Sequence, residues 1–307
     1  MSSQNPYRYE VNHDWAKLPD GVAFGYTHGI ALDKQGRVFI FNMSKDAVMM
    51  FDDEGHFLQS WGEEFASGAH GMKIHEEHGV EYLYLSDIER GLVIKTTLEG
   101  RTVMTLSAPN HLDLYGPGED GVERKFVPTD VAVAPNGDIY VADGYGQSYI
   151  HKFNPDGTYL LSWGGKGTAQ GQLDCPHGVS IDMRTGEPLV YVADRGNRRI
   201  QVFSLDGEPL QIISDDLHAP CSFSFHGEDL YIPDLMSRVT ILGQNNRLIS
   251  HIGETEDYKK EGWPNLPKGS VADGTFSSPH SVCVAPNGDI YVVEWVEYGR
   301  VTKLSRI

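Results

Sequence analysis

The feature that most constrains the fold of this chain is a segment that recurs six times along it. The clearest copies begin at residues 127–129, 175–177 and 278–280, and each leads to a second apolar run that ends in an acidic residue. Weaker copies begin at Thr27, Ala69 and Ala219. Self-similarity at a regular interval is the mark of a repeat architecture, and it outweighs any single local signal.

Each copy contains short apolar runs separated by turns rich in Gly, Asn and Asp, such as residues 135–137 and 286–288. Four short strands at a period of about 40 to 50 residues are typical of a β-propeller blade. The sequence therefore predicts an all-β, six-bladed β-propeller with four-stranded blades, formed by residues 1–307 as a single domain. A β-sandwich, the alternative architecture, would not repeat its sequence in this way.

The last copy lacks an outer strand, because only residues 305–307 follow its third apolar run. We expect the amino-terminal strand near residues 7–11 to complete this blade and so to remove the open sheet edge. Two intervals are stretched by residues 107–125 and 254–275, which are rich in Gly, Pro and charge. These segments are predicted as long loops, where substrate specificity would lie.

Alignment of the copies brings four histidines to one position of the first strand. The first strand lies nearest the axis of a propeller, so this position should form a ring around the central channel. Neutral imidazole is the commonest transition-metal ligand, and three imidazoles with an open position are a known catalytic zinc arrangement. We predict a divalent metal here, with zinc first and iron, manganese or copper as alternatives. The ring consists of His28, His70, Thr129, His177, Cys221 and His280.

The other nine histidines, including His111 and His151, are predicted to be ordinary surface or packing residues. A second ring is expected where the second strands end, although a recurring acid often caps a turn through the backbone. Just beyond it, Tyr145 is a candidate general acid or base and Arg195 a candidate clamp for a carboxylate or oxyanion. The second ring consists of Asn42, Asp87, Asp143, Asp194, Asp234 and Glu294.

Composition excludes several classes of partner. The net charge of −18, from 43 acidic and 25 basic residues, argues against nucleic acid, whose phosphates are bound by Lys and Arg. No apolar run is long enough to cross a membrane and no leader is recognisable, so a soluble cytoplasmic protein is expected. Three cysteines without a Cys-x-x-Cys spacing indicate neither a disulfide framework nor a zinc knuckle.

Five motifs, at residues 128–133, 143–145, 175–178, 193–195 and 278–281, carry a family resemblance. On these residues the chain resembles the NHL-repeat propeller of peptidyl-α-hydroxyglycine α-amidating lyases, most clearly over residues 126–203. In that family three histidines hold zinc, and a tyrosine and arginines assist as a carbinolamide is split into an amide and glyoxylate. The resemblance implies metal ligation by His70, His177 and His280, with catalytic roles for Tyr145 and Arg195.

The chain departs from this family at three positions. Met43 stands where relatives carry a second arginine, and Ser281 where the lyases carry an aspartate that helps to bind a structural calcium, so calcium binding is left open. His28 stands where relatives carry a small residue. It would close a four-histidine site, bind the metal differently or carry protons. Peptide amidation itself is therefore not expected.

The leading hypothesis is a metal-dependent lyase that acts on a small hydroxylated or carboxylated substrate at the channel. One alternative is an NHL-type protein-interaction platform. Another is a lactonase-type hydrolase, which would bind calcium or zinc mainly through the carboxylate and Asn oxygens of the second ring. The residues predicted to line the substrate pocket are Met43, Thr129, Asp143, Asp194, Cys221 and Glu294.

Overall fold

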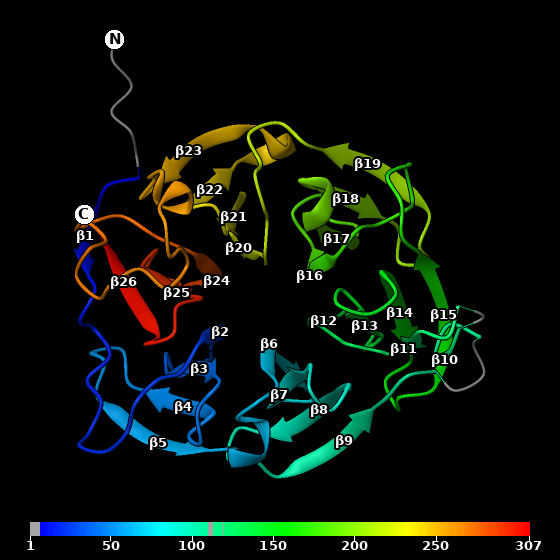
Figure 1. Ribbon diagram of the computed structural model, residues 1–307, viewed down its shortest axis with the longest axis horizontal. Helices are drawn as coiled ribbons and strands as arrows, with labels where there is room; N and C mark the ends of the chain where they lie inside the picture. Colours follow the sequence, from blue (N-terminus) through cyan, green and yellow to red (C-terminus); the bar gives the residue numbers. More distant parts are fainter. Residues whose placement is uncertain (1–6, 110–112, 119) are drawn as a thin grey trace.

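Six antiparallel sheets of four strands stand around a central axis in the computed structural model, which describes residues 7–109, 113–118 and 120–307 (Figure 1). No α-helix occurs in these residues. Short 3-10 turns are present at η1 (Glu63–Phe65), η2 (Arg195–Asn197), η3 (Gln244–Asn246) and η4 (Asp257–Lys259). The fold is a six-bladed β-propeller, as the repeat predicts.

Every blade runs from the axis outward in the order of the chain, apart from the last. Blades one to three are β2 (Thr27–Leu32), β3 (Val38–Asn42), β4 (Val48–Phe51) and β5 (Phe57–Trp61); β6 (Ala69–Glu77), β7 (Val80–Asp87), β8 (Leu92–Thr97) and β9 (Thr102–Leu106); and β12 (Asp130–Val133), β13 (Ile139–Ala142), β14 (Tyr149–Phe153) and β15 (Tyr159–Gly164). Blades four to six are β16 (Pro176–Asp182), β17 (Leu189–Asp194), β18 (Arg199–Phe203) and β19 (Pro209–Ile213); β20 (Ser224–His226), β21 (Asp229–Asp234), β22 (Arg238–Leu242) and β23 (Leu248–Ile252); and β24 (Pro279–Val284), β25 (Ile290–Glu294), β26 (Arg300–Arg306) and β1 (Tyr9–Asn12).

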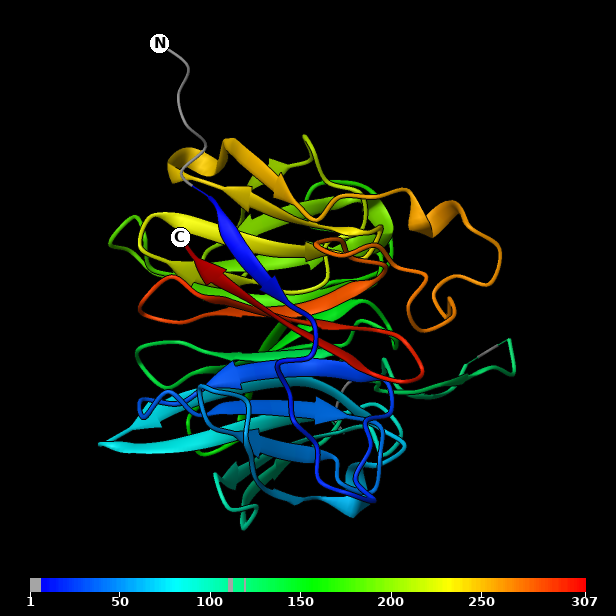
Figure 2. The ribbon, with the colours of Figure 1, turned by 90° about the vertical axis from the view of Figure 1, so that its left-hand side faces the viewer.

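The two ends of the chain meet in the sixth blade. Strand β1 pairs antiparallel with β26, with Val11 opposite Leu304, so the amino-terminal strand supplies the outer strand as predicted. Figure 2 shows the two strands side by side at the rim. This pairing closes the ring, because it joins the first and last segments of the chain in one sheet.

The hydrophobic core lies between neighbouring blades rather than at one centre. In the first such layer, Phe39 and Phe41 of β3 belong to the same buried cluster as Leu83 and Leu85 of β7. Strands β3 and β13 are buried along their whole length, because each sheet packs against a neighbour on both faces. The continuous apolar runs of the repeat follow from this stacking.

Both predicted long loops are present, and Figure 2 shows them extending from the same side of the disc. The first contains a small hairpin, β10 (Gly116–Pro117) with β11 (Glu123–Arg124), whereas the second contains only η4. Tyr115 of the first donates a hydrogen bond to Asp143, and Asn265 of the second donates one to Tyr26. His111, predicted as a surface or packing residue, lies outside the described residues.

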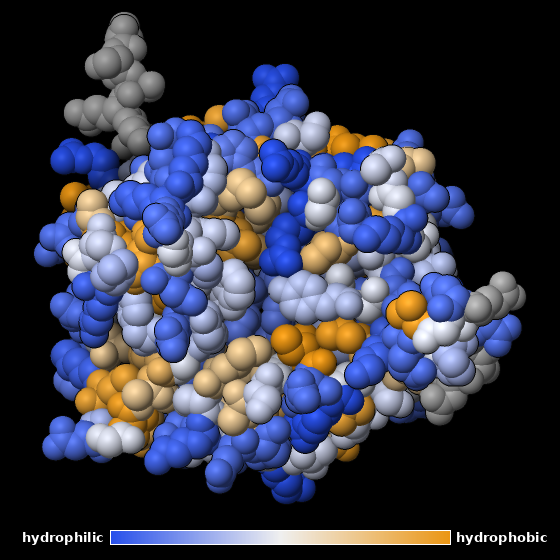
Figure 3. All heavy atoms as spheres, viewed as in Figure 1, coloured by the Kyte–Doolittle hydropathy of each residue, from blue (hydrophilic) through white to orange (hydrophobic). Residues whose placement is uncertain are grey.

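On the face viewed down the axis, hydrophilic residues predominate and hydrophobic residues occur in small groups (Figure 3). In the described part of the chain, no helix has the length and hydropathy needed to cross a membrane. The cytoplasmic location remains a prediction.

Candidate metal centre

Four inner strands carry an irregularity at their histidine. The pairing of each inner strand with its neighbour shifts register between Thr27 and Gly29, between Ala69 and Met72, between Pro176 and Gly178, and between Pro279 and Ser281. A β-bulge of this kind re-aims the side chain of the residue that it leaves unpaired. In all four strands the interval contains the ring histidine.

Small residues after the histidines let the inner strands approach closely. A Cβ atom on Gly71 would lie 2.5 Å from the carbonyl oxygen of Thr129, and one on Gly178 would lie 2.4 Å from that of Cys221. Both neighbouring atoms belong to the backbone of the next blade and cannot move aside easily. The His-Gly pair of the repeat is therefore explained by contact between adjacent blades.

This close approach fixes the protonation of the imidazoles. His70 Nδ1 lies 2.7 Å from the carbonyl oxygen of Thr129, His177 Nδ1 lies 2.8 Å from that of Cys221, and His280 Nδ1 lies 2.9 Å from that of His28. A carbonyl oxygen only accepts, so each Nδ1 must carry a proton and donate it. The lone pair is consequently left on Nε2 in all three rings.

Burial keeps these rings neutral. Together with the neighbouring His28, it lowers the pKa of His70 well below the usual value for histidine. The pKa of His177 is lowered by burial and by the charge of Arg195, and that of His280 by burial and by its histidine neighbours. The protein therefore presents uncharged imidazoles with free Nε2 lone pairs, the form that binds metals.

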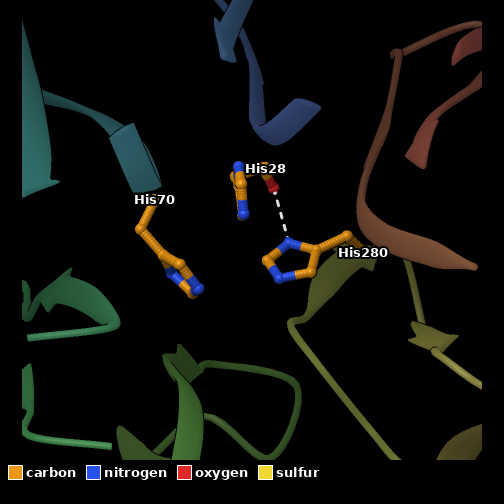
Figure 4. Close-up of side chains that lie close together, drawn as sticks. All are labelled: His28, His70 and His280. Carbon is orange, nitrogen blue, oxygen red and sulfur yellow. Dashed lines mark hydrogen bonds between the residues drawn. The ribbon is translucent and has the colours of Figure 1, made fainter. Parts of the chain in front are cut away.

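The three rings lie close together, and Figure 4 shows two of them, His70 and His280, pointing toward one another. Ring centroids are 4.8 Å apart for His70 and His177, 4.7 Å for His177 and His280, and 5.0 Å for His70 and His280. Two imidazoles sharing one ion about 2.1 Å from each nitrogen have centroids about 4.5 to 5.2 Å apart, for angles of about 90 to 110° at the ion. The observed separations lie inside this range, so the three rings are close enough to share a metal ion.

Among the described residues, two groups of donor atoms lie close enough to hold an ion, and neither contains His70 and His177 together. Ligand atoms of His28, His70 and His280 all lie within 4.8 Å of one another, and so do those of His177, Cys221 and His280. Burial raises the pKa of the Cys221 thiol to about 11, so it is protonated in the absence of a metal. His280 is common to both groupings.

The phenol of Tyr145 reaches the cluster from the loop after β13. Its Oη lies 3.2 Å from His70 Nε2 and 3.1 Å from His177 Nε2, and it accepts a hydrogen bond of 3.2 Å from Arg195 Nη2. Burial raises the pKa of Tyr145, against the opposing effect of Arg195. The phenol has a single proton, so it can donate to only one of the two imidazoles at a time.

Arg195 is held by weak acceptors. Apart from Tyr145 Oη, its guanidinium contacts the sulfur atoms of Cys175, at 3.4 Å, and Cys221, at 3.9 Å. Among the described residues no carboxylate forms an ion pair with it, although acidic residues outnumber basic ones in this protein. Its positive charge is therefore free to meet an anionic ligand.

The predicted pocket residues fall into separate surroundings. Thr129 and Cys221 line a narrow cavity between the rings, whose free volume of about 10 Å³ is roughly that of one water-sized group. Met43 instead packs against the buried cluster between the first two blades. Met43 occupies the position in the first blade that Arg195 occupies in the fourth, so the first blade contributes no charge there.

Side chains of the second ring accept hydrogen bonds from backbone amides just before the inner strands. Asp194 Oδ1 accepts a hydrogen bond of 2.7 Å from the Asp174 amide, and it is also paired with Arg199. The equivalent bonds run from the amides of Gly25, Val127, Ala219 and Ser277 to Asn42, Asp143, Asp234 and Glu294 respectively. Asp87 accepts instead from Arg90 of its own loop. Asn42, Asp143, Asp194 and Glu294 thus secure the chain two or three residues before the ring position.

Two polar networks were not anticipated from the sequence. His151 lies fully buried in β14, with Nε2 2.6 Å from Tyr115 Oη and Nδ1 2.6 Å from Ser162 Oγ. In the lining of the central cavity, Lys73 Nζ lies 3.8 Å from Asp130 Oδ2. Asp130 belongs to a recurring motif, but nothing in the sequence shows that its partner comes from the preceding blade.

This fold and site define the class of protein. The NHL repeat model matches residues 127–153, 173–203 and 276–304, which lie in the third, fourth and sixth blades. The chain is therefore a β-propeller that contains NHL repeats and has a buried histidine cluster on its axis, and the predicted resemblance to NHL-repeat propellers is confirmed.

Its similarity to particular proteins is modest. It is 28% identical to peptidyl-alpha-hydroxyglycine alpha-amidating lyase 1 of Drosophila melanogaster, over 90% of this chain and 56% of that protein. It is 25% identical to peptidyl-glycine alpha-amidating monooxygenase of Mus musculus, over 87% and 29%, and 29% identical to NHL repeat-containing protein 3 of Homo sapiens, over 64% and 57%. The chain thus spans between about a third and a little over half of these relatives.

Solved structures share the architecture at low identity. Virginiamycin B lyase from Staphylococcus aureus superposes with a TM-score of 0.63 at 12% identity, covering 98% of this chain and 100% of that one. A gluconolactonase from Xanthomonas campestris gives 0.62 at 16% identity, covering 95% and 87%. These similarities show the propeller fold.

Proposed function

We propose that this protein is a metal-dependent lyase whose substrate is a small molecule with a hydroxyl group and a carboxylate. The observation that carries the proposal is the position of the Tyr145 phenol, which lies within 3.2 Å of two imidazole nitrogens and of a guanidinium that has no acidic partner. A proton carrier, a candidate metal centre and an anion-binding charge therefore adjoin one another at the channel. The similarity to amidating lyases supports the same reading.

The metal would be held by Nε2 of His70, His177 and His280, one from each of the second, fourth and sixth blades. A divalent ion bound there supplies a Lewis acid for the oxygen of a substrate hydroxyl as negative charge develops on it. The chain contributes the rigid frame: each Nδ1 proton is held by a carbonyl oxygen of the next blade, which fixes the tautomer and aims Nε2 at the axis.

Tyr145 is the group that would move the proton. With the imidazole lone pairs of His70 and His177 engaged, its hydroxyl is left to exchange a proton with the substrate. Arg195, which donates to the phenol oxygen, favours the phenolate at the moment when the proton leaves. Its remaining donors would bind a substrate carboxylate, because a guanidinium matches the two carboxylate oxygens geometrically.

The lactonase-type alternative requires oxygen ligands from the second ring. Asp194 is bound to a backbone amide, to Asn197 and to Arg199, and Glu294 accepts from two backbone amides. Oxygen atoms already engaged in these bonds would have to give them up to hold calcium or zinc. The imidazole cluster needs no such rearrangement, so the geometry favours the histidine site.

The interaction platform remains a prediction without a specific structural observation in its favour. The face in Figure 3 has scattered rather than continuous hydrophobic residues. A large apolar patch would be the expected sign of a protein-binding face. The enzyme proposal is the one that explains why polar groups are buried on the axis.

The test is metal analysis joined to a lyase assay. Purified protein would be analysed for metal, then assayed against a panel of small α-hydroxy amides and hydroxy acids before and after chelation. We expect close to one equivalent of metal, lost in His177→Ala, and activity that returns when metal is added back. His226→Gln, in the inner strand of the fifth blade outside the cluster, is the matched control and should keep its metal. Less than about 0.2 equivalents in wild type, with no response to zinc, iron or manganese, would contradict the proposal.

A further inference from the structure

His28 shares the bulge and the buried position of the other three ring histidines, although its Nδ1 bonds to Tyr26 of its own segment rather than to the next blade. It lies within the register shift between Thr27 and Gly29, and the glycine after it faces the next blade, where a Cβ atom would lie 2.7 Å from Met72 Cβ. Its side chain is buried, at 4% exposure. The sequence repeat and the local backbone therefore treat His28 as an equal member of the ring.

The His28 ring also points into the cluster. Its centroid is 4.9 Å from that of His70 and 4.8 Å from that of His280, within the separation expected for imidazoles that share an ion. Figure 4 shows the three rings facing a common space. The His28 Nδ1 atom donates to the carbonyl oxygen of Tyr26, at 3.2 Å, so the lone pair of this ring lies on Nε2 as well.

No other role accounts for that lone pair. Within the described chain, Nε2 of His28 has no hydrogen-bond donor, and the phenol of Tyr145 contacts His70 and His177 instead. A nitrogen of a buried ring that lies within 4.8 Å of the ligand atoms of two other imidazoles has the position of a ligand.

We propose that His28 is a fourth metal ligand, which makes the centre a four-imidazole site for a divalent ion that accepts five or six ligands. This inference rests on the proposed function and refines it. Four protein nitrogens would close a tetrahedral zinc site and leave no place for a substrate. An ion of higher coordination number, such as iron or manganese, keeps one or two positions open for substrate oxygens while all four histidines remain bound.

The donor set makes the choice of metal testable without substrate. Wild type, His28→Ala, His177→Ala and the control His226→Gln would each be loaded with Zn²⁺, Fe²⁺ or Mn²⁺. Affinity would be measured by competition with a chromophoric chelator, and the ligands would be counted by X-ray absorption at the metal edge. Thermal unfolding of the metal-free proteins would show whether each variant folds.

We expect four imidazole nitrogens around the ion in wild type, with one or two oxygen ligands. In His28→Ala we expect three nitrogens and an affinity lowered by more than about 100-fold, which exceeds the usual loss on removing an outer-shell partner. Added free imidazole should restore the fourth nitrogen. Three nitrogens in wild type, or an unchanged affinity and ligand count in His28→Ala, would overturn the inference and leave the proposed function standing. Failure of wild type to bind metal, or an unaltered site in His177→Ala, would remove the proposed function itself.

Discussion

The buried imidazole of His151 makes a quantitative test of the structure. It lies between Tyr115 Oη and Ser162 Oγ, at 2.6 Å from each, and is inaccessible to solvent. Burial lowers the pKa of His151 from 6.5 to about 4. The folded protein therefore keeps this ring neutral down to about pH 4, whereas the unfolded chain protonates it below about pH 6.5.

The sign of the effect follows from proton binding. Between these two pH values the unfolded state binds more protons, so acidification favours unfolding. The contribution is negligible above about pH 7.5, destabilises the fold by about 2 kcal/mol at pH 5, and levels off at about 3.4 kcal/mol below pH 4. His151→Gln should abolish it, because glutamine offers a donor and an acceptor to the same neighbours and takes no proton.

Urea unfolding of metal-free wild type and His151→Gln at pH 7.5 and pH 5 measures the difference. We expect wild type to lose about 2 kcal/mol more than the variant on acidification. The central histidines are common to both proteins and cancel in the comparison. Asp143, whose pKa burial raises to about 6, bonds to the same Tyr115 hydroxyl as His151, so the comparison is made with Asp143→Asn present in both proteins. A lower stability of the variant at both pH values would not affect the result. Equal losses in the two proteins would refute the assignment of a neutral, buried His151.

The remaining predictions concern the ring and its closure. Asp194→Asn should lower the free energy of unfolding by about 2 to 4 kcal/mol, because it removes the partner of buried Arg199, yet it should keep its metal, whereas His177→Ala should lose metal with a smaller change in stability. Urea unfolding and metal analysis on the same samples separate the two effects. Gly178→Ala should destabilise the fold by more than about 2 kcal/mol in urea unfolding, since its Cβ atom would lie 2.4 Å from the Cys221 carbonyl oxygen; a neutral effect would contradict the contact. Deletion of residues 1–12 should expose the β26 edge and give concentration-dependent aggregation in light scattering, and a monomeric, equally stable product would argue against closure by β1.

The sequence predicted the architecture because all six blades of the propeller must meet the same packing requirement. Each blade must bury both faces of its second strand, so runs such as residues 38–42 and 139–142 are apolar throughout and recur at a regular interval. The last copy of the repeat has only three strands, and this predicted that the amino-terminal strand would supply the fourth. The hairpin β10–β11 could not be predicted, because its few paired residues leave no periodic pattern.

The histidine cluster was predictable for a related reason, whereas its details were not. Equal repeat positions must lie at equal distances from the axis, so the sequence alone indicated that His70, His177 and His280 converge. It did not show that bulges aim the rings, or that Nδ1 of each binds the neighbouring blade. His151 is a buried packing residue, within the prediction, but its bond to Tyr115 could not be predicted because Tyr115 comes from an irregular loop, which carries no repeat signal.

The two rings show why position in a repeat does not by itself decide function. Both lie near the channel and both recur in every blade, yet Asp194 and its equivalents accept bonds from backbone amides that would otherwise be buried without partners. The histidines bond to backbone carbonyls with one nitrogen and keep the second nitrogen for the centre of the ring, where those of His70 and His177 contact Tyr145. A side chain with two separate hydrogen-bonding atoms can hold the frame and still present a ligand, and this is why the candidate chemistry lies with the imidazoles rather than with the acids.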